Sequence, residues 1–319
     1  MGAILQNASG YGGLDQTPLA RPGYHEKIMA RVYERDWIRE ITNSQIAERI
    51  TADTQTVQIM KAPTTGRRRR YQKNQPMIPS QVTTTAICLS ICNAAYLDIK
   101  VDDLDIHWSG PRWSSFEDAF LEDAYQNYTA DQREWVLNAM LAEASPQTQG
   151  LNAGKYHNWN LGERGNPVIV NATNIAREMS ILQQVLMDQL AWRENEMFCV
   201  MPTLFRTVLV QSNFANAAWT GTAAPGTIAI DGLWPHQLSG FDIIETIHAP
   251  SFIDDNGDLC FYIIAGSTDA FAYAGDIIRG RLIDKDPNTF GVRYQTLDVW
   301  GGKMIYPERV AVACWRFQV

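Results

Sequence analysis

The sequence predicts a mixed α+β protein in which two helices are set among a larger number of strands. The first observation is the segment 114–144, where Ser114 and Glu117 form a capping box ahead of a helical apolar stripe. The second is a shorter helical stripe at 174–193. The third is the turn chemistry of the remaining segments, where Asn256-Gly257 lies between two apolar runs and predicts a hairpin.

The segment 114–144 is the longest predicted element. A second capping pair, Thr129 with Gln132, leaves two interpretations open: one helix, or two helices joined at a bend. A continuous helix would be ~45 Å long at ~1.5 Å per residue, which is typical of a structural spine. The apolar face has four members at i+4 spacing: Phe116, Phe120, Ala124 and Tyr128.

The second helix and the β-rich runs follow from local patterns. "TVQIMKAP" (56–63) alternates and ends at a proline, as a strand does, and "AICLSICNAAYLDIKV" (86–101) is a second β-rich run. The long polar, glycine-rich segment 145–167 is predicted to be a loop that is functional, mobile or at a contact. The stripe of the second helix comprises Ile175, Met179, Leu182, Leu186 and Leu190, and its cap candidates are Asn171, Thr173 and Asn174.

Composition excludes several classes of protein. The chain has 319 residues, 45% of them apolar, so it can bury a sizeable core and is not disordered by composition. Its net charge of −8 argues against a protein whose whole surface grips a duplex, because such a protein needs a broad basic face. No apolar run approaches the ~20 residues that span a bilayer. The chain start lacks a secretory pattern and the five cysteines suit reduced thiols, so we expect a cytoplasmic setting.

The sequence holds no motif for catalysis, a cofactor or a metal. The five histidines lie singly, without the His or Cys at i+3 or i+4 that a helical metal pair needs. "DDNGD" (254–258) fails the spacing of a calcium loop and fits a hairpin turn. No Walker loop, dinucleotide glycine pattern or G-x-S-x-G elbow is present. We therefore expect no enzyme, no catalytic residues, no cofactor and no metal.

Two charged clusters stand out. Carboxylates in the long helix could suggest acid–base chemistry, but acids in a first turn also complement the helix dipole, and we interpret them as a solvated or partner-facing surface. These carboxylates are Glu117, Asp118, Glu122 and Asp123. The second cluster is "GRRRRYQKNQ" (66–75), which contains Arg67, Arg68, Arg69, Arg70 and Lys73.

The basic cluster needs a partner outside its own domain. If 67–73 is extended, successive side chains point to opposite sides, so cations face both ways. Such a strand cannot be buried without paired acids. Two kinds of partner satisfy it: phosphates, or carboxylates on a neighbouring chain.

Four C-terminal segments carry a resemblance. "MFCVMPTLFRTVLVQSNFANA" (197–217) has a strand that ends in proline and leads into a helix, and "GLWPHQLSGFDIIETIHAP" (232–250) has spaced Gly, Gly-Phe and Pro. "CFYIIAGSTDAFAYAGDII" (260–278) has a strand, a small-residue turn and then an expected helix. "FGVRYQTLDVWGGKMIYPERVAVACW" (290–315) closes with Gly, an apolar pair, Pro-Glu and a last strand. In this order they resemble the major capsid proteins of tailed bacteriophages, whose fold also builds herpesvirus capsid floors and encapsulin shells.

The resemblance implies a tailed-phage major capsid fold with a spine helix, and it covers most of the chain from about residue 28. The domains that it implies are an N-terminal arm (1–50), an extended hairpin loop (51–105), a peripheral domain with the spine helix (106–215), an axial domain (216–285) and closing strands of the peripheral domain (286–319).

The resemblance also implies a function. Such subunits self-assemble as hexamers and pentamers into an icosahedral virion shell around double-stranded DNA, without sequence-specific binding, in the host cytoplasm. Scaffolding, portal and decoration or cement proteins are the further partners it suggests, and no membrane. The extended loop would lie over a neighbouring subunit, where the planar guanidinium groups of Arg67–Arg70 suit bidentate pairing with carboxylates. The acidic residues of the long helix are then the predicted partner surface.

Three alternatives remain open from the sequence. A nucleic-acid-binding protein led by the arginines would show DNA affinity that falls steeply with salt. An encapsulin-like compartment on the same fold would enclose a cargo enzyme. A tail or neck component of a virus is the third.

Overall fold

The computed structural model describes residues 36–43, 56–63, 70, 73, 79, 82–109, 113–194, 196–212, 237–283 and 290–318. The chain contains both helices and strands, with runs of consecutive strands such as β6 (Gln237–Leu238) to β11 (Gly291–Met304), which confirms the mixed α+β class. The chain divides into two compact units. The first comprises Met1–Asp36, Cys92–Gln132 and Gly275–Trp300, and the second comprises Trp37–Ile91, Arg133–Ala274 and Gly301–Val319.

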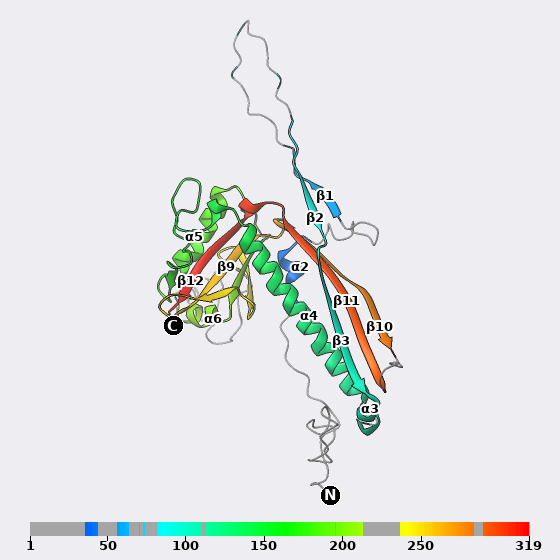
Figure 1. Ribbon diagram of the computed structural model, residues 1–319. Coiled ribbons are helices and arrows are strands. Elements are labelled where there is room, and N and C mark those ends of the chain that lie inside the picture. The colour runs from blue at the N-terminus through cyan, green and yellow to red at the C-terminus, as the bar shows by residue number, and fades with distance from the viewer. Residues whose placement is uncertain are drawn as a thin grey trace, which may run out of the picture. The chain divides into compact units, whose positions relative to one another are not determined.

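The second unit is built on a seven-stranded sheet with the order β4-β12-β9-β5-β7-β6, and β8 pairs with β9 (Figure 1). The β5–β7 and β12–β4 pairs are parallel, and the other pairs are antiparallel. The strands are β4 (Val168–Val170), β5 (Met197–Pro202), β6 (Gln237–Leu238), β7 (Phe241–Thr246), β8 (Ser251–Ile253), β9 (Leu259–Ser267) and β12 (Val310–Phe317).

One face of this sheet carries the main core. α5 (Ile175–Asp188) and α6 (Leu204–Val210) cover it, and Leu182, Phe205 and Trp315 are among its buried members. All six residues of β5 are buried, as expected of an apolar strand that is covered on both faces. The predicted strand–Pro–helix segment, the closing segment and the Asn256-Gly257 hairpin are confirmed. The short 3-10 helices are η4 (Pro146–Thr148) and η6 (Pro307–Arg309).

The second predicted helix is confirmed, but it ends earlier than the sequence pattern indicates. α5 stops at Asp188, and Leu190, assigned to the apolar stripe, is 89% exposed with a φ of 56°. The amide of Leu190 donates to the carbonyl of Met187, and that of Ala191 donates to the carbonyl of Leu186. This is the Schellman arrangement, so a left-handed residue ends the helix here without a glycine.

The long predicted helix is one continuous element, α4 (Trp113–Glu143). The helix continues through Thr129, whose hydroxyl donates to the carbonyl of Gln126 at 2.9 Å and so does not act as an N-cap. Of the predicted apolar face, Ala124 and Tyr128 are half-buried. The side chains of Ser114, Phe116 and Phe120 lie outside the described part of the structure, and so does the predicted capping box.

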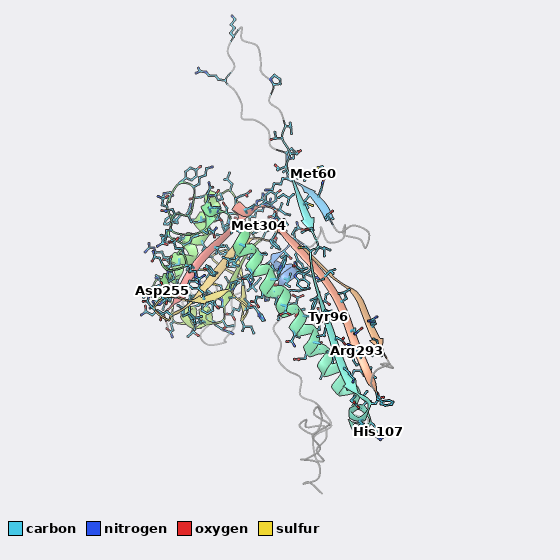
Figure 2. All side chains as sticks on the ribbon, viewed as in Figure 1. Met60, Tyr96, His107, Asp255, Arg293 and Met304 are labelled. Carbon is cyan, nitrogen blue, oxygen red and sulfur yellow. The ribbon has the colours of Figure 1, made fainter. Side chains whose placement is uncertain are left out.

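The first unit contains most of a three-stranded sheet with the order β10-β11-β3, and α3 (Asp103–Ser109) follows β3 along the chain (Figure 1). The strands of this sheet are β3 (Asn93–Asp102), β10 (Phe271–Ile283) and β11 (Gly291–Met304). Figure 2 labels Tyr96 on β3 and Arg293 on β11. The helix expected after the turn in 260–278 is wrong, because β10 occupies that place. Phe271, Ala272, Tyr273 and Ala274 are all buried, and four consecutive buried residues suit a strand covered on both faces better than one helix stripe.

Strand pairing groups the chain differently from the predicted domains. β5 and β12 were expected in the peripheral domain and β7 and β9 in the axial domain, yet all four share the seven-stranded sheet. Hydrogen bonding between strands far apart in the sequence decides this grouping. Because strand pairing by itself does not test domain boundaries, the five domain names and boundaries stay a prediction.

Candidate assembly interface

The basic segment lies in the connection between two paired strands. β1 (Thr56–Met60) and β2 (Ala86–Ser90) are antiparallel, with Met60 opposite Ala86, which confirms both predicted strand runs. Arg70 and Lys73 belong to this connection and are exposed. The other three arginines, Arg67, Arg68 and Arg69, lie outside the described residues.

The root of this connection is fixed by a small core in the second unit. Leu89 is fully buried with Ala272, Ala274 and Ile305, and the side chains of Ile59, Ile87 and Tyr306 pack against them. Two cations also lie over the Tyr306 ring: the Lys61 ammonium at 5.1 Å and the Arg309 guanidinium at 4.0 Å from its centroid. Both strands that carry the basic segment are therefore held by packing and by charge.

The acidic residues of α4 have different surroundings. The Glu117 carboxylate accepts a hydrogen bond from the Tyr294 hydroxyl of β11, so it is engaged inside its own unit. Glu122 is exposed and accepts from the Gln126 amide at 2.9 Å, and Asp123 accepts from the Asn127 amide at 3.4 Å. The side chain of Asp118 lies outside the described part. Of the four predicted carboxylates, Glu122 is the one that the structure describes as exposed.

A polar network on the three-stranded sheet was not anticipated from the sequence. Asp98 on β3 accepts from Arg293 Nε at 2.6 Å and from Gln295 Nε2 at 2.9 Å, and Gln295 Oε1 accepts from Arg281 Nε at 2.6 Å. The hydrogen bond from Arg293 lowers the pKa of the Asp98 carboxyl below its usual value. Because these residues come from three strands, no local sequence signal could have found them.

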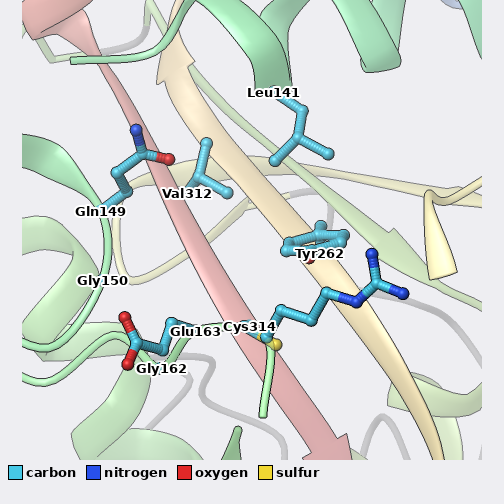
Figure 3. A pocket seen from close by; sticks show the side chains of 9 residues that line it. Leu141, Gln149, Gly150, Gly162, Glu163, Tyr262, Val312 and Cys314 are labelled. Atoms are coloured by element: carbon cyan, nitrogen blue, oxygen red, sulfur yellow. The ribbon is translucent and has the colours of Figure 1, made fainter. Parts of the chain in front are cut away.

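The polar loop 145–167 is folded against the seven-stranded sheet. Gly162 has a φ of 80°, and a Cβ there would lie 2.4 Å from the Cys314 carbonyl oxygen. The loop, the end of α4, β9 and β12 line a hollow of about 300 Å³ (Figure 3). Glu163, Tyr262 and Cys314 are among its lining residues. Burial raises the pKa of the Cys314 thiol to about 12, so the thiol stays protonated at neutral pH and is a poor nucleophile.

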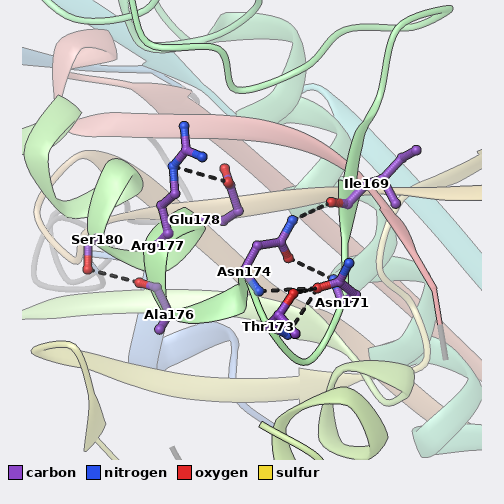
Figure 4. Close-up of polar contacts among 8 residues, drawn as sticks. All are labelled: Ile169, Asn171, Thr173, Asn174, Ala176, Arg177, Glu178 and Ser180. Atoms are coloured by element: carbon purple, nitrogen blue, oxygen red, sulfur yellow. Dashed lines mark hydrogen bonds and ion pairs between the residues drawn. The ribbon is translucent and has the colours of Figure 1, made fainter. Parts of the chain in front are cut away.

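The polar turn before α5 is occupied by capping (Figure 4). Asn171 Oδ1 accepts from the Thr173 amide at 3.0 Å, the Thr173 hydroxyl at 2.6 Å and the Asn174 amide at 3.2 Å. Asn174 occupies the N-cap position, but its side chain turns back to the Asn171 amide and the Ile169 carbonyl. Of the three cap candidates, Asn171 is therefore the one whose side chain accepts hydrogen bonds from the Thr173 and Asn174 backbone amides.

Across the described residues, no group of three or more His, Cys, Asp or Glu side chains is placed to hold a metal ion. None of the helices in that part of the chain has the length and apolarity needed to cross a bilayer. The five cysteines are all free, with Cys88 and Cys92 exposed and the other three buried.

Comparison with known proteins identifies the fold. No family model matches the sequence, and no curated protein matches it. A chain from Mycobacterium phage Che8 matches with a TM-score of 0.67 and 16% identity, over 92% of this chain and 95% of that one. The mature capsid of bacteriophage PhiM1 matches at 0.62 and 10%, over 92% and 91% of the two chains. The capsid of cyanophage P-SCSP1u matches at 0.61 and 10%, over 92% of each. The chain has the tailed-phage major capsid fold, as the sequence resemblance predicted.

Proposed function

We propose that this chain is a major capsid protein, which self-assembles as hexamers and pentamers into the icosahedral shell around the double-stranded DNA genome of a tailed phage. The observation that carries the proposal is the likeness to solved phage capsid subunits over 92% of this chain and over 91% and 92% of two of those subunits. The proposal includes a structural role without catalysis, assembly in the host cytoplasm, and scaffolding, portal and decoration or cement proteins as further partners.

Exposed apolar side chains support an assembled state. Met60, Tyr96 and Phe290 are 76%, 79% and 86% exposed. Each is large, and covering such a side chain contributes about 25 cal/mol per Å² of apolar area. Contacts between neighbouring subunits would remove this apolar area from water.

The basic connection is proposed to contact a neighbouring subunit. Arg70 and Lys73 are exposed, which such a contact requires, and the predicted set also includes Arg67, Arg68 and Arg69. The proposed acceptors are Glu117, Asp118, Glu122 and Asp123. Glu122 is the strongest candidate because it is exposed, whereas Glu117 already accepts from Tyr294. Exposed ion pairs contribute only ~0.2–1 kcal/mol each, but a shell repeats them in every subunit.

Negative-stain electron microscopy of the expressed protein, alone and with its neighbouring genes, tests the function. Closed shells of uniform diameter are expected, and DNA inside those formed during infection would support a genome container. A protein cargo instead would favour an encapsulin-like compartment. Monomers under every condition, together with salt-sensitive DNA binding, would contradict the proposal.

A charge variant tests the contact. Replacing Arg67–Arg70 together by serine should abolish or greatly reduce shell formation while leaving the circular dichroism of the subunit unchanged. Arg177→Ser is the matched control, because Arg177 is 77% exposed on α5 and outside the proposed contact. Normal shells from the serine variant would refute the assigned role of the arginines but leave the shell function standing.

A further inference from the structure

The three-stranded sheet of the first unit carries a hollow of about 400 Å³. Directly opposed residues of β3 and β11 share a face, and along this face three pairs follow one another: Tyr96 with Leu297, Asp98 with Gln295, and Lys100 with Arg293. Successive pairs are two residues apart, or about 7 Å along the strands. The face therefore has three levels: apolar, polar and cationic.

The apolar level is open to solvent. Tyr96 is 79% exposed and Leu297 is 40% exposed, and both line the hollow. Aromatic side chains with this exposure supply large contact area at little conformational cost, and for that reason they recur at the centres of protein interfaces. This level fits an apolar side chain of a partner.

The polar level holds a cation in a fixed position. Arg281 donates from Nε to Gln295 Oε1, and Gln295 donates in turn to Asp98. Within the described part of the chain, the two terminal nitrogens of Arg281 have no hydrogen-bond partner, and neither does the ammonium of Lys100. A guanidinium that is fixed through Nε and open at both terminal nitrogens is ready to bind a carboxylate in a bidentate manner.

We propose that this face binds an extended acidic segment of a partner protein, with the pattern apolar-x-acid-x-acid in either direction. An extended peptide places residues i, i+2 and i+4 on one side at the same ~7 Å spacing as the three levels. Its apolar side chain lies between Tyr96 and Leu297, and its two carboxylates lie on Arg281 and Lys100. The occupant is a second protein, and the site does not depend on the proposed shell function.

The chemistry of the face favours an acidic peptide over nucleic acid. A duplex backbone offers no apolar group to fill the level of Tyr96 and Leu297. A peptide can place its carboxylates at two positions only and leave Asp98 to Arg293 and Gln295.

Fluorescence anisotropy with defined peptides on the full chain tests the proposal. The probe is fluorescein-labelled Ser-Phe-Ser-Glu-Ser-Glu-Ser, with its reversed sequence and a version that has lysine for both glutamates. Either the acidic probe or its reversed sequence should bind at least tenfold more tightly than the lysine version. Arg281→Glu should weaken binding at least tenfold and Tyr96→Ser about fivefold. Lys155→Glu reverses an exposed cation on the polar loop and should leave affinity unchanged.

Two further measurements keep the result interpretable. Arg281→Gln retains a donor for Gln295 and removes the charge, so it replaces Arg281→Glu if that variant fails to fold by circular dichroism. A duplex oligonucleotide of 20 base pairs should not compete with the acidic peptide. The proposal would be overturned if the lysine peptide bound as tightly as the acidic one, or if neither Arg281 variant changed the affinity for the acidic peptide. It would also be overturned if the duplex competed with the peptide, or if two copies of this chain associated through this face and so excluded the peptide. Failure of shell assembly would leave it untouched.

Discussion

The two sheets of this protein contain strands that differ sharply in how many of their residues are buried. All six residues of β5 in the seven-stranded sheet are buried, whereas none of the ten residues of β3 in the three-stranded sheet is. The first sheet has helices on its core face, and its strands read as apolar runs. In the second, β3 has only half-buried and exposed positions, and charged side chains lie on the open face of the sheet. We therefore expect the stability of the chain to reside mainly in the seven-stranded sheet, whereas β3 of the other sheet leaves its side chains more exposed.

Truncating one aromatic residue in each sheet region is the strongest test of that difference. Phe205→Ala removes a fully buried ring from the main core and should lower the free energy of unfolding by about 3–5 kcal/mol. Tyr96→Ala removes an exposed ring and should change it by less than about 0.5 kcal/mol. Urea denaturation of the unassembled subunit measures both. Similar losses for the two variants would mean that the three-stranded sheet is as tightly packed as the other.

Two glycines of the polar loop test how closely that loop fits the packed sheet. Gly162→Ala should cost roughly 3 kcal/mol, because the φ of 80° is strained for alanine and its Cβ would meet the Cys314 carbonyl and the Val168 amide. Gly165→Ala is the matched control. Its φ is 95° but nothing lies within 4 Å of the added Cβ, so only the backbone strain of about 1 kcal/mol is expected. Thermal unfolding measures both variants. Equal decreases in their unfolding temperatures would contradict a tight contact between the loop and the sheet.

The sequence carried local information well and long-range pairing poorly. α4, α5 and the Asn256-Gly257 hairpin were predictable because neighbours within a few residues encode them. The helix expected after Ala270 was wrong, because small apolar residues suit a buried strand as well as a helix and only strand pairing decides. Asp98 and Arg293 are 195 residues apart, and Glu117 and Tyr294 are 177 apart, so no periodicity could join them. The contact role of Arg67–Arg70 stays a prediction.

Opposite pH responses are expected from two aspartates on opposite faces of the three-stranded sheet. Asp298 is buried, and burial raises its pKa; it therefore costs stability once ionised. The free energy of unfolding should fall as pH rises through about 4, the pKa in the unfolded chain, towards the raised pKa of the folded state. Asp298→Asn, which imitates the neutral acid, should gain about 1–2 kcal/mol at pH 7 and nothing at pH 3.

Asp98 provides the comparison for that experiment. Arg293 lowers its pKa, so its contribution is present above about pH 4 and is lost as pH falls through the lower folded value. Asp98→Asn should therefore destabilise slightly at pH 7 and become equal to the parent at low pH. Urea denaturation at pH 3, 5 and 7 measures both variants. Parallel pH profiles for the two would contradict the assignment of one buried and one ion-paired carboxylate.

The smallest expected effect comes from the turn before α5, and it tests whether capping stabilises the second unit in addition to burial. Asn171→Ala removes an acceptor of three hydrogen bonds at the start of α5 and should cost about 1 kcal/mol, the usual value of a cap. Ser180→Ala is the control on the same helix. Its hydroxyl donates to the Ala176 carbonyl inside the helix, a bond whose loss is offset by the higher helix propensity of alanine, so no loss is expected. Urea denaturation measures the free energy of unfolding of both variants. Equal stability would mean that burial of the apolar stripe alone stabilises α5 and that the capping turn before it contributes nothing.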